Sequence, residues 1–274
     1  MTTTATAQDI ESVIAQLEAI IHQCESTGDR LGYFAALYHK VTCKVKEDID
    51  NKLFEDGSRL AELDVVFANR YLCAYSQWKA DKNSPLVSAS WRVAFKSAEA
   101  SSYLVLHHLL LGMNAHINYD LGIAVAELAA KGNDVDALRR DYNSINNVLG
   151  ALTYGVINKL NIVSPFLSVL GFTGTNSNSM LVQFSLGTAR DGAWLFATDL
   201  IACGTDTQKY TDLTLKRDTE ISELGTLLTQ SKGFLKFGIF IIRLFEWKNV
   251  KKVIEVLHTH QKLRFSEVKA NIKR

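Results

Sequence analysis

The sequence has little proline and no closely spaced cysteines. It contains only two prolines in 274 residues, and because proline interrupts helix interiors, so low a number is typical of a mainly helical chain. The four cysteines are scattered, with no CxxC pair of the kind that binds a metal or forms a redox couple. We expect reduced, mostly buried thiols, which favour a cytoplasmic protein.

An excess of one charge and a long apolar run are also missing. The formal net charge is +1, so we expect no nucleic acid as a partner. No apolar run reaches the length of about 18 residues that a membrane-spanning helix needs. The first residues, MTTTATAQDIES, lack the basic start and apolar stretch of a signal peptide. P-loop, GxGxxG, GxSxG and HExxH motifs are absent, so nucleotide binding, hydrolase-elbow and zincin chemistry have no support.

Apolar residues recur at helical spacing along most of the chain, as in residues 7–27. The pattern predicts an all-α, multi-helix, bundle-like fold with a single domain over residues 1–274. The predicted helices cover residues 7–27, 30–50, 58–79, 84–130, 135–160, 189–203, 213–230, 233–246 and 250–265. In the segment 84–130 we expect Ser84 as the N-cap, Pro85 as the first helical residue, and a break near Ala98–Ser102.

Residues 171–188 are rich in Gly, Thr, Ser and Asn and predict the longest irregular segment of the chain. Long ordered loops in compact domains are often functional, so this segment is one alternative location for a site.

The segment HHLLLGMNAHINYDLGIA, residues 107–124, is apolar enough for a buried helix but carries six polar side chains. At 100° per residue, Asp120 lies about 40° from His116 around the helix axis, so the two are neighbours one turn apart. His107, Asn114 and Asn118 fall on the opposite side. Buried polar groups are unfavourable unless they are hydrogen-bonded, so these residues need an explanation.

Three interpretations of this polar helix remain open. The Asn and His side chains could clamp neighbouring helices; His116 oriented by Asp120 could be a general acid or base; or His116 and Asp120 could chelate a divalent metal as a cofactor. In the catalytic interpretation, His108, Asn114 and Asn118 hold the substrate or a water molecule. The predicted substrate-binding residues are Tyr119, Trp91, Trp194, Arg190 and Asp141.

Residues 231–274 form a basic C-terminal helical extension. They contain eleven Lys/Arg and three Glu, a net charge of +8, whereas the preceding 230 residues carry −7. The apolar stretch FLKFGIFIIRLFEW within them could contact a membrane surface, with residues 231–265 as the contact segment. The alternative is a C-terminal helix packed on the core.

Several motifs together resemble a bacterial domain family of unknown function with actinobacterial and cyanobacterial members. They are LFEDGSRLAELDVVFANRYL, the central NAHINYDL, RRDYNSIN and ARDGAW, and the resemblance covers about residues 30–200. It implies an all-α fold and no established activity. By resemblance, the central motif contains His108, Asn114, His116, Asn118 and Asp120, and the flanking motifs contain Asp141, Asn146, Arg190 and Trp194. The extension from about Gly233 has no counterpart in this pattern.

Two functions follow as hypotheses. The first is an enzyme that acts on a small, largely apolar molecule in a pocket between helices, by acid–base or metal-assisted chemistry of the His/Asn/Asp cluster. The second is a non-enzymatic protein that binds lipid or a membrane surface through its basic C-terminal segment.

Overall fold

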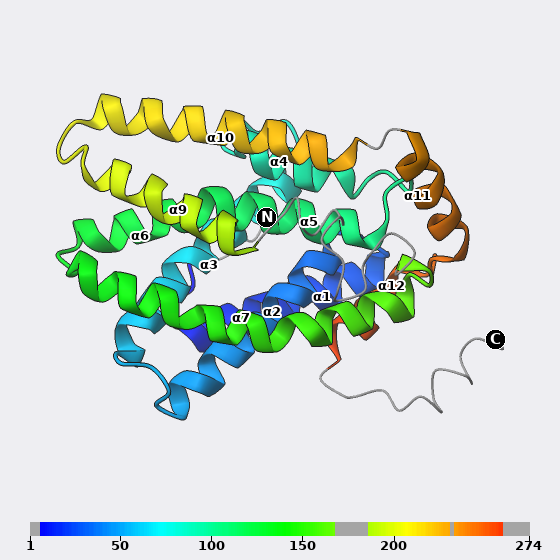
Figure 1. Cartoon of the computed structure of the whole chain (residues 1–274), viewed down its shortest axis with the longest axis horizontal. Coiled ribbons are helices and arrows are strands. Elements are labelled where there is room, and N and C mark those ends of the chain that lie inside the picture. Colours follow the sequence, from blue (N-terminus) through cyan, green and yellow to red (C-terminus); the bar gives the residue numbers. More distant parts are fainter. Residues whose placement is uncertain (1–5, 168–185, 231–232, 260–274) are drawn as a thin grey trace.

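The structure is a computed structural model that describes residues 6–167, 186–230 and 233–259. In these ranges every regular element is a helix and no strand is present, so the predicted all-α, multi-helix fold is confirmed (Figure 1). The elements are α1 (Ile10–Thr27), α2 (Gly32–Asp50), α3 (Gly57–Ala80), α4 (Ala89–Ser97), α5 (Val105–Ala115), the π-helix η1 (His116–Asp120), α6 (Leu121–Ala130), α7 (Val135–Val163), α9 (Leu186–Ile201), α10 (Thr207–Thr229), α11 (Gly233–Phe245) and α12 (Val250–His258).

Most predicted helices are present to within a few residues, and the expected break after α4 is confirmed. Helix α4 ends at Ser97 and α5 begins at Val105. The predicted start of α4 is wrong. Ser84 and Pro85 lie in a turn, and the N-cap is Ser88, whose hydroxyl oxygen accepts a hydrogen bond from the Trp91 N–H at 3.3 Å.

Two predicted segments lie partly outside the described residues. Of the expected irregular segment 171–188, only residues 186–188 are described, and they form the first turn of α9. Of the expected helix 250–265, the structure describes α12 up to His258 and then Thr259.

The helices α5, η1 and α6 form one nearly continuous rod through the middle of the molecule (Figure 1). From Val105 to Ala126 every side chain except Met113 is buried. A helix that is apolar on all sides must be covered on all sides, and here α2, α3, α4, α9 and α10 pack around it. The polar residues of this rod are therefore interior residues.

The π-helix η1 is a local widening of this rod. The Leu121 N–H donates to the His116 carbonyl oxygen, five residues back, in place of the usual four. Immediately after it, Gly122 allows α6 and α9 to approach closely, since a Cβ there would lie 2.8 Å from the Ala193 carbonyl oxygen. This contact places the first turns of α9 beside η1.

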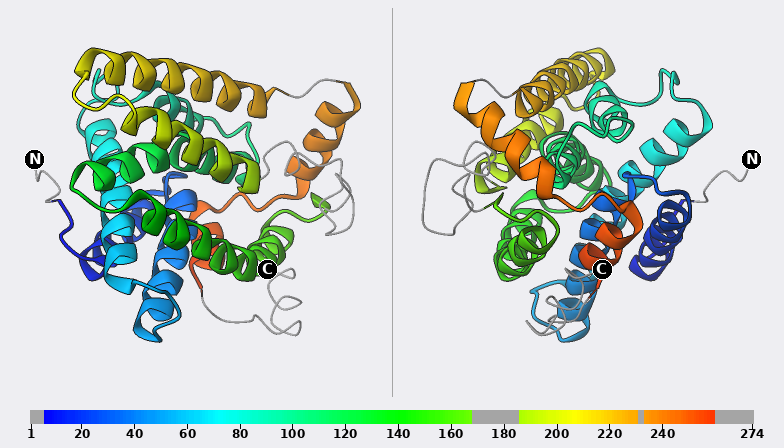
Figure 2. Two further views of the ribbon diagram at one scale, coloured as in Figure 1. Left: turned by 60° about the vertical axis from the view of Figure 1, so that its left-hand side comes forward. Right: turned by 90° about the vertical axis from the view of Figure 1, so that its right-hand side faces the viewer.

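The two helices of the basic extension differ in their surroundings. Helix α12 lies against α1 and α2 (Figure 2), with Val253 and Ile254 fully buried. The Lys159 ammonium of α7 donates to the Leu257 carbonyl oxygen at its end. Helix α11 instead exposes several large apolar side chains. Among the helices of the described residues, none has both the length and the apolar character needed to cross a membrane.

Candidate functional site

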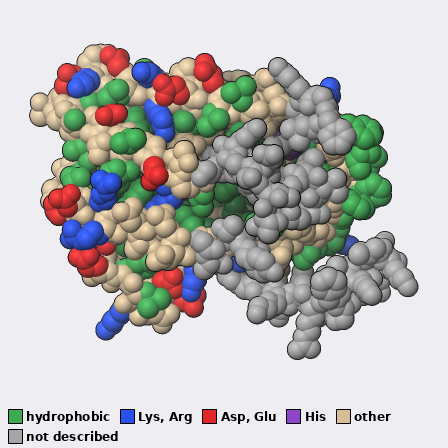
Figure 3. Space-filling model, viewed as in Figure 1, with side chains coloured by type: hydrophobic (Ala, Val, Ile, Leu, Met, Phe, Trp, Pro, Cys, Tyr) green, Lys and Arg blue, Asp and Glu red, His purple; other side chains and the backbone are tan. Residues whose placement is uncertain are grey.

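A cavity of about 330 Å³ lies between the central rod and the helices α2, α3, α7 and α9. Hydrophobic side chains are visible in a recess beside α7 and α9 in the space-filling view (Figure 3). One stripe of α7 supplies much of the wall: Tyr142, Ile145, Leu149, Leu152, Val156, Ile157 and Leu160. The wall is mostly aliphatic and aromatic, as in pockets for small apolar ligands.

Five residues bring polar side-chain atoms to this wall. They are Tyr38 of α2, Asp64 of α3, His116 of η1, Tyr142 of α7 and Arg190 of α9. His116 and Arg190 were expected in the site, and the structure places them in one cavity although they are far apart in the sequence.

His116 is held by Asp120 on one side and by aromatic rings on the others. Its Nδ1 lies 3.4 Å from the Asp120 Oδ2. Its ring stacks on Phe67 at 3.6 Å between centroids and meets the edge of Tyr38 at 4.4 Å. The Nε2 atom is buried and has no hydrogen-bond partner among the described residues. The imidazole is thus fixed in orientation with one nitrogen unused.

Asp120 is itself held by two further donors. The Trp91 indole N–H donates to its Oδ2 at 2.8 Å, and the Arg70 Nε–H donates to its Oδ1 at 3.1 Å. Both carboxylate oxygens therefore have hydrogen-bond donors that fix the orientation of the group. Its Oδ2 can also accept a hydrogen bond from the His116 Nδ1–H, which leaves the Nε2 lone pair on the other side of the ring.

Burial lowers the pKa of His116, and the Asp120 carboxylate only partly offsets this effect. The ring is therefore neutral at neutral pH. In this form Nε2 can accept a proton, and Asp120 can stabilise the imidazolium that results.

Asp64 is a functional candidate that our sequence reasoning missed. Its Oδ2 is buried without a hydrogen-bond partner among the described residues, and burial raises the pKa of its carboxyl group to about 7. A carboxyl group with such a pKa exchanges a proton near neutral pH. The sequence did carry a signal, because Leu60, Asp64 and Phe67 share the apolar face of α3, where a lone carboxylate is unusual.

The two asparagines of the polar helix have structural contacts instead of a place in the cavity. The Asn114 amide N–H donates to the Ile221 carbonyl oxygen of α10 at 2.8 Å, and Asn118 donates to the Asn114 Oδ1 at 3.0 Å. The Arg217 Nε–H donates to the Asn118 carbonyl oxygen. For these two residues the geometry favours the clamp interpretation.

The histidines at the start of α5 also lie apart from the large cavity. The Leu104 N–H donates to the His107 Nδ1 at 3.1 Å, so His107 caps the helix. His108 lies 3.3 Å from the Ser97 hydroxyl and lines a separate space of about 20 Å³. Burial lowers the pKa of His107 to about 4 and that of His108 to about 3. Both are neutral at neutral pH, which suits interior packing.

Of the residues expected to bind substrate, only Arg190 lines the cavity. Trp91 acts through Asp120, as described above. Tyr119 packs with Phe196 and Ile221 in a smaller apolar cluster, and Trp194 contacts the Tyr142 ring at 5.1 Å from outside the cavity lining.

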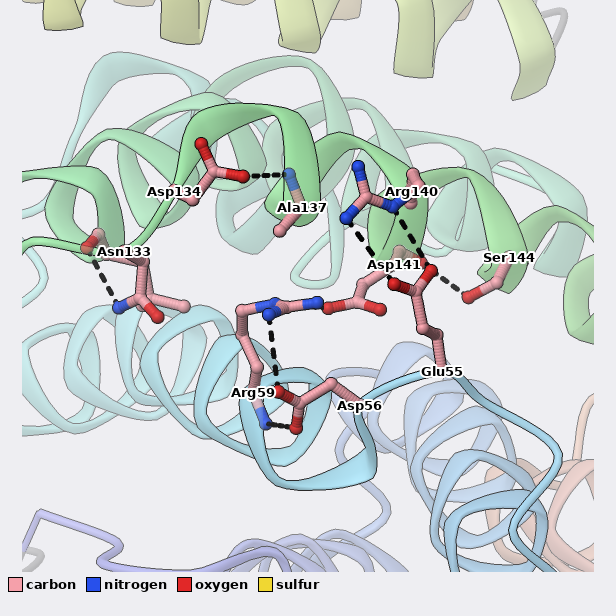
Figure 4. Close-up of polar contacts among 10 residues, drawn as sticks. Glu55, Asp56, Arg59, Asn133, Asp134, Ala137, Arg140, Asp141 and Ser144 are labelled. Carbon is pink, nitrogen blue, oxygen red and sulfur yellow. Dashed lines mark hydrogen bonds and ion pairs between the residues drawn. The ribbon is translucent and has the colours of Figure 1, made fainter.

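Asp141 belongs to a polar interface between α3 and α7 (Figure 4). Its Oδ2 pairs with the Arg59 Nε at 2.5 Å, and next to it Glu55 pairs with Arg140. These contacts join two of the helices that line the cavity.

A metal site would need further ligands. Within the described residues no three His, Cys, Asp or Glu side chains are grouped so that they could hold a metal ion. His116 and Asp120 are close enough for a hydrogen bond to each other, and the nearest groups to Asp120 are the donors Trp91 and Arg70.

Comparison with known proteins assigns the chain to a family. Residues 10–231 match the model of a family of unknown function, DUF5995. The chain belongs to this family. The family match contains the whole cavity lining and ends just before α11. No curated protein and no solved structure matches the chain.

Proposed function

We propose that this DUF5995 protein binds a small, largely apolar molecule in the cavity and acts on it by acid–base chemistry. One observation carries the proposal: three buried polar atoms without hydrogen-bond partners among the described residues, the Tyr38 hydroxyl oxygen, the His116 Nε2 and the Asp64 Oδ2, belong to side chains that line a mostly apolar cavity. A buried polar group without a partner is unfavourable and needs an explanation, and a catalytic or ligand-binding role is one such explanation.

Each polar residue has a distinct role in this proposal. His116 is the catalytic acid or base through Nε2, and Asp120 is a positioning residue that sets its tautomer and stabilises its protonated form. Trp91 and Arg70 position Asp120. Asp64, with its raised pKa, is a second proton donor or acceptor on the facing helix. The aliphatic wall excludes water, which keeps these proton transfers directed to the ligand.

Metal-assisted chemistry at His116 and Asp120 is the competing proposal. A catalytic metal is usually held by three protein ligands, and these two residues supply two. We therefore propose that the reaction uses the His116–Asp120 pair directly.

The binding step is tested with N-phenyl-1-naphthylamine, a neutral dye whose fluorescence increases in apolar surroundings. We expect saturable binding by the wild type and loss of binding in Leu152→Trp, which fills the cavity from α7. Asn158→Trp is the matched control, since residue 158 is on the exposed face of the same helix. Dye binding that is unaffected by Leu152→Trp, or absent from the wild type, would contradict the proposal.

The chemical step is tested on molecules that co-purify with the protein. They are extracted, identified by mass spectrometry and incubated in D₂O with fresh protein, so that proton transfer is detected as deuterium incorporation. We expect a changed or deuterated product with the wild type and with His108→Gln, and none with His116→Gln. A ligand that stays unlabelled and unchanged with the wild type would refute the acid–base role.

A second candidate function, binding to a membrane surface, is favoured by α11. Its Phe237 and Phe240 are 60% and 53% exposed, and hydrophobic side chains gather over this helix at the right-hand edge of Figure 3. Lys236 and Lys248 are exposed beside them, as in helices that lie in a lipid interface.

This candidate is tested by co-sedimentation with vesicles that contain anionic lipid. We expect Phe237→Ser/Phe240→Ser to abolish sedimentation, and Leu53→Ser/Leu215→Ser, which changes exposed leucines elsewhere, to leave it unchanged. Point variants are preferable to removal of residues 231–274, because α12 belongs to the core. Equal sedimentation of both variants would exclude α11 as the contact.

The four cysteines form no disulfide in the structure. This supports the expectation of a reducing compartment such as the cytoplasm, which we retain as part of the proposal.

A further inference from the structure

Arg190 is a buried cation that forms no ion pair with the residues that the structure describes. Its side chain is 5% exposed and lines the cavity. Its Nε–H donates to the Asn146 Oδ1 at 2.7 Å and its Nη2 donates to the Tyr142 carbonyl oxygen, so both of its protein acceptors are neutral. The guanidinium also lies over the Tyr142 ring, with its Cζ 4.1 Å from the ring centroid, which is again a neutral partner.

Other arginines near the cavity are paired. Arg59 forms an ion pair with Asp141, and Arg70 forms one with Asp120. In the described residues no carboxylate lies within 4.0 Å of the Arg190 guanidinium. Asp191, the next residue, is exposed and acts on it only at longer range. A buried guanidinium is strongly unfavourable unless an anion completes its site.

The cavity's own carboxyl group does not supply this anion. Asp64 lines the same cavity but makes no ion pair with Arg190, and the raised pKa of its carboxyl group, about 7, comes from burial alone. Among the described residues, neither Asp64 nor any other carboxylate forms an ion pair with Arg190, so an anionic group of a ligand would complete its site.

The rest of the cavity is suited to a hydrocarbon chain. Tyr142, beside Arg190, is the first cavity residue of α7, and Leu160 is the last. The eighteen residue steps from Tyr142 to Leu160 span about 27 Å at 1.5 Å per residue. Every residue that α7 contributes after Tyr142 is aliphatic.

The direction of the helices determines the order of Arg190 and His116 along the part of α7 that lines the cavity. Helices α6 and α7 are joined by a short turn at residues 131–134, so the rod and α7 run in opposite directions (Figure 1). Leu121 of the rod and Tyr142 of α7 are therefore at the end that holds Arg190, and Leu106 and Leu160 are at the other end. His116 lies between these ends.

We infer that the ligand is a long-chain carboxylate, with its head group bound by Arg190 and its hydrocarbon chain lying along α7 past His116. A guanidinium matches a carboxylate in shape and charge. This inference rests on the proposed function, since it names the class of molecule that occupies the same cavity.

The test compares three probes with the same chain length and different head groups: dodecanoate, dodecan-1-ol and dodecylamine. The affinity of each probe is measured from its ability to displace N-phenyl-1-naphthylamine from the full chain. Each probe is used below the concentration at which it aggregates. We expect the wild type to bind dodecanoate roughly tenfold or more tightly than dodecan-1-ol, the difference that one charge-assisted pair produces, and dodecylamine most weakly.

The variant Arg190→Gln should lose the preference for dodecanoate while it still binds the neutral dye, and Arg190→Lys should keep part of it. Arg217→Gln is the matched control, because Arg217 is half-buried on α10 and is not in the cavity lining. A wild type that binds dodecan-1-ol as tightly as dodecanoate overturns the inference, as does an unchanged preference in Arg190→Gln.

Binding of the dye distinguishes a failure of this inference from a failure of the proposed function. If the wild type does not bind N-phenyl-1-naphthylamine, the apolar cavity is not a binding site and both fail. If the dye binds and only the carboxylate preference is absent, the cavity proposal stands and the ligand class is wrong.

Discussion

At the scale of single residues, Asp64 couples protonation to folding. Its pKa is about 7 in the folded chain against an ordinary value of 3.8. Between these two pH values the unfolded chain gives up the proton while the folded chain keeps it, so the contribution of Asp64 to stability is greatest at low pH and is lost as pH rises to about 7. The loss amounts to about 4 kcal/mol, at about 1.4 kcal/mol for each pKa unit.

Asp64→Asn should remove this dependence. We expect the stability of the variant relative to the wild type to increase between pH 4 and pH 7 and to stay level above, as measured by urea unfolding across this range. Comparison at each pH cancels the opposite contribution of the buried histidines, which destabilise the folded chain as pH falls below their ordinary pKa. A difference between the two proteins that does not vary with pH would show that Asp64 is not buried in this way.

Whether the role of a single residue could be predicted depends on how far away in the sequence its contact partners lie. The pairing of His116 with Asp120 follows from helical spacing and is present in the structure. The sequence alone could not separate a clamp from a catalytic role for Asn114, because its partner, the Ile221 carbonyl oxygen, lies 107 residues away. Asp64 was missed because the apolar face of α3 was defined by its hydrophobic members only.

At the scale of elements, the start of α4 is determined by a residue of another helix. The Asp218 carboxylate of α10 accepts from the Ala89 N–H at 2.6 Å and from the Ser90 N–H at 2.9 Å. The N–H groups of the first helical turn have no acceptor within their own helix. The helix dipole also favours an anion at this end of the helix. This contact selects Ser88 over Ser84 and Pro85 as the start, which local sequence rules could not show.

We therefore expect Asp218→Asn to lower the free energy of unfolding by about 1–3 kcal/mol, because it removes a charged acceptor from two buried donors. The matched control is Asp212→Asn on the same helix, whose side chain contacts Gln208 near the surface and whose change should stay within about 0.5 kcal/mol. Urea unfolding at neutral pH measures both. Equal effects of the two substitutions would mean that Ser88 alone caps α4.

The π-helix is the other element that spacing could not predict. The pattern of residues 107–124 indicated a regular α-helix, and the extra residue in η1 is visible only in the Leu121-to-His116 hydrogen bond. It places the histidine–carboxylate pair of the rod, His116 and Asp120, at the first and last residues of the π-helical turn.

At the scale of the whole molecule, the basic extension and the family region share one core. The main cluster of buried apolar residues runs from Ala7 to Leu257 and includes Val253 and Ile254 of α12. The sequence left open whether residues 231–274 contact a membrane or pack on the core, since Phe and Ile at helical spacing fit both. The structure assigns α12 to the core, and the function of α11 stays a proposal.

Ile254→Ala should then destabilise the chain by about 2–5 kcal/mol, as expected for a buried aliphatic residue. Leu17→Ala in α1 should have an effect of similar size, and Phe240→Ala on the exposed face of α11 should change stability by less than about 0.5 kcal/mol. A single unfolding transition in all three variants would support one domain. A separate early transition in Ile254→Ala would instead show that α12 unfolds independently.

The position of α12 has a practical consequence for work on related chains. The family match ends at residue 231, and a gene fragment cut at that boundary would encode a protein whose α1–α2 groove is uncovered. Gly32 of α2 has no side chain, so Ile254 packs directly against it, and a Cβ there would lie 2.6 Å from the Ile254 Cδ1. Expression of the family region alone should therefore give insoluble material, and boundaries for cloning should be drawn after α12.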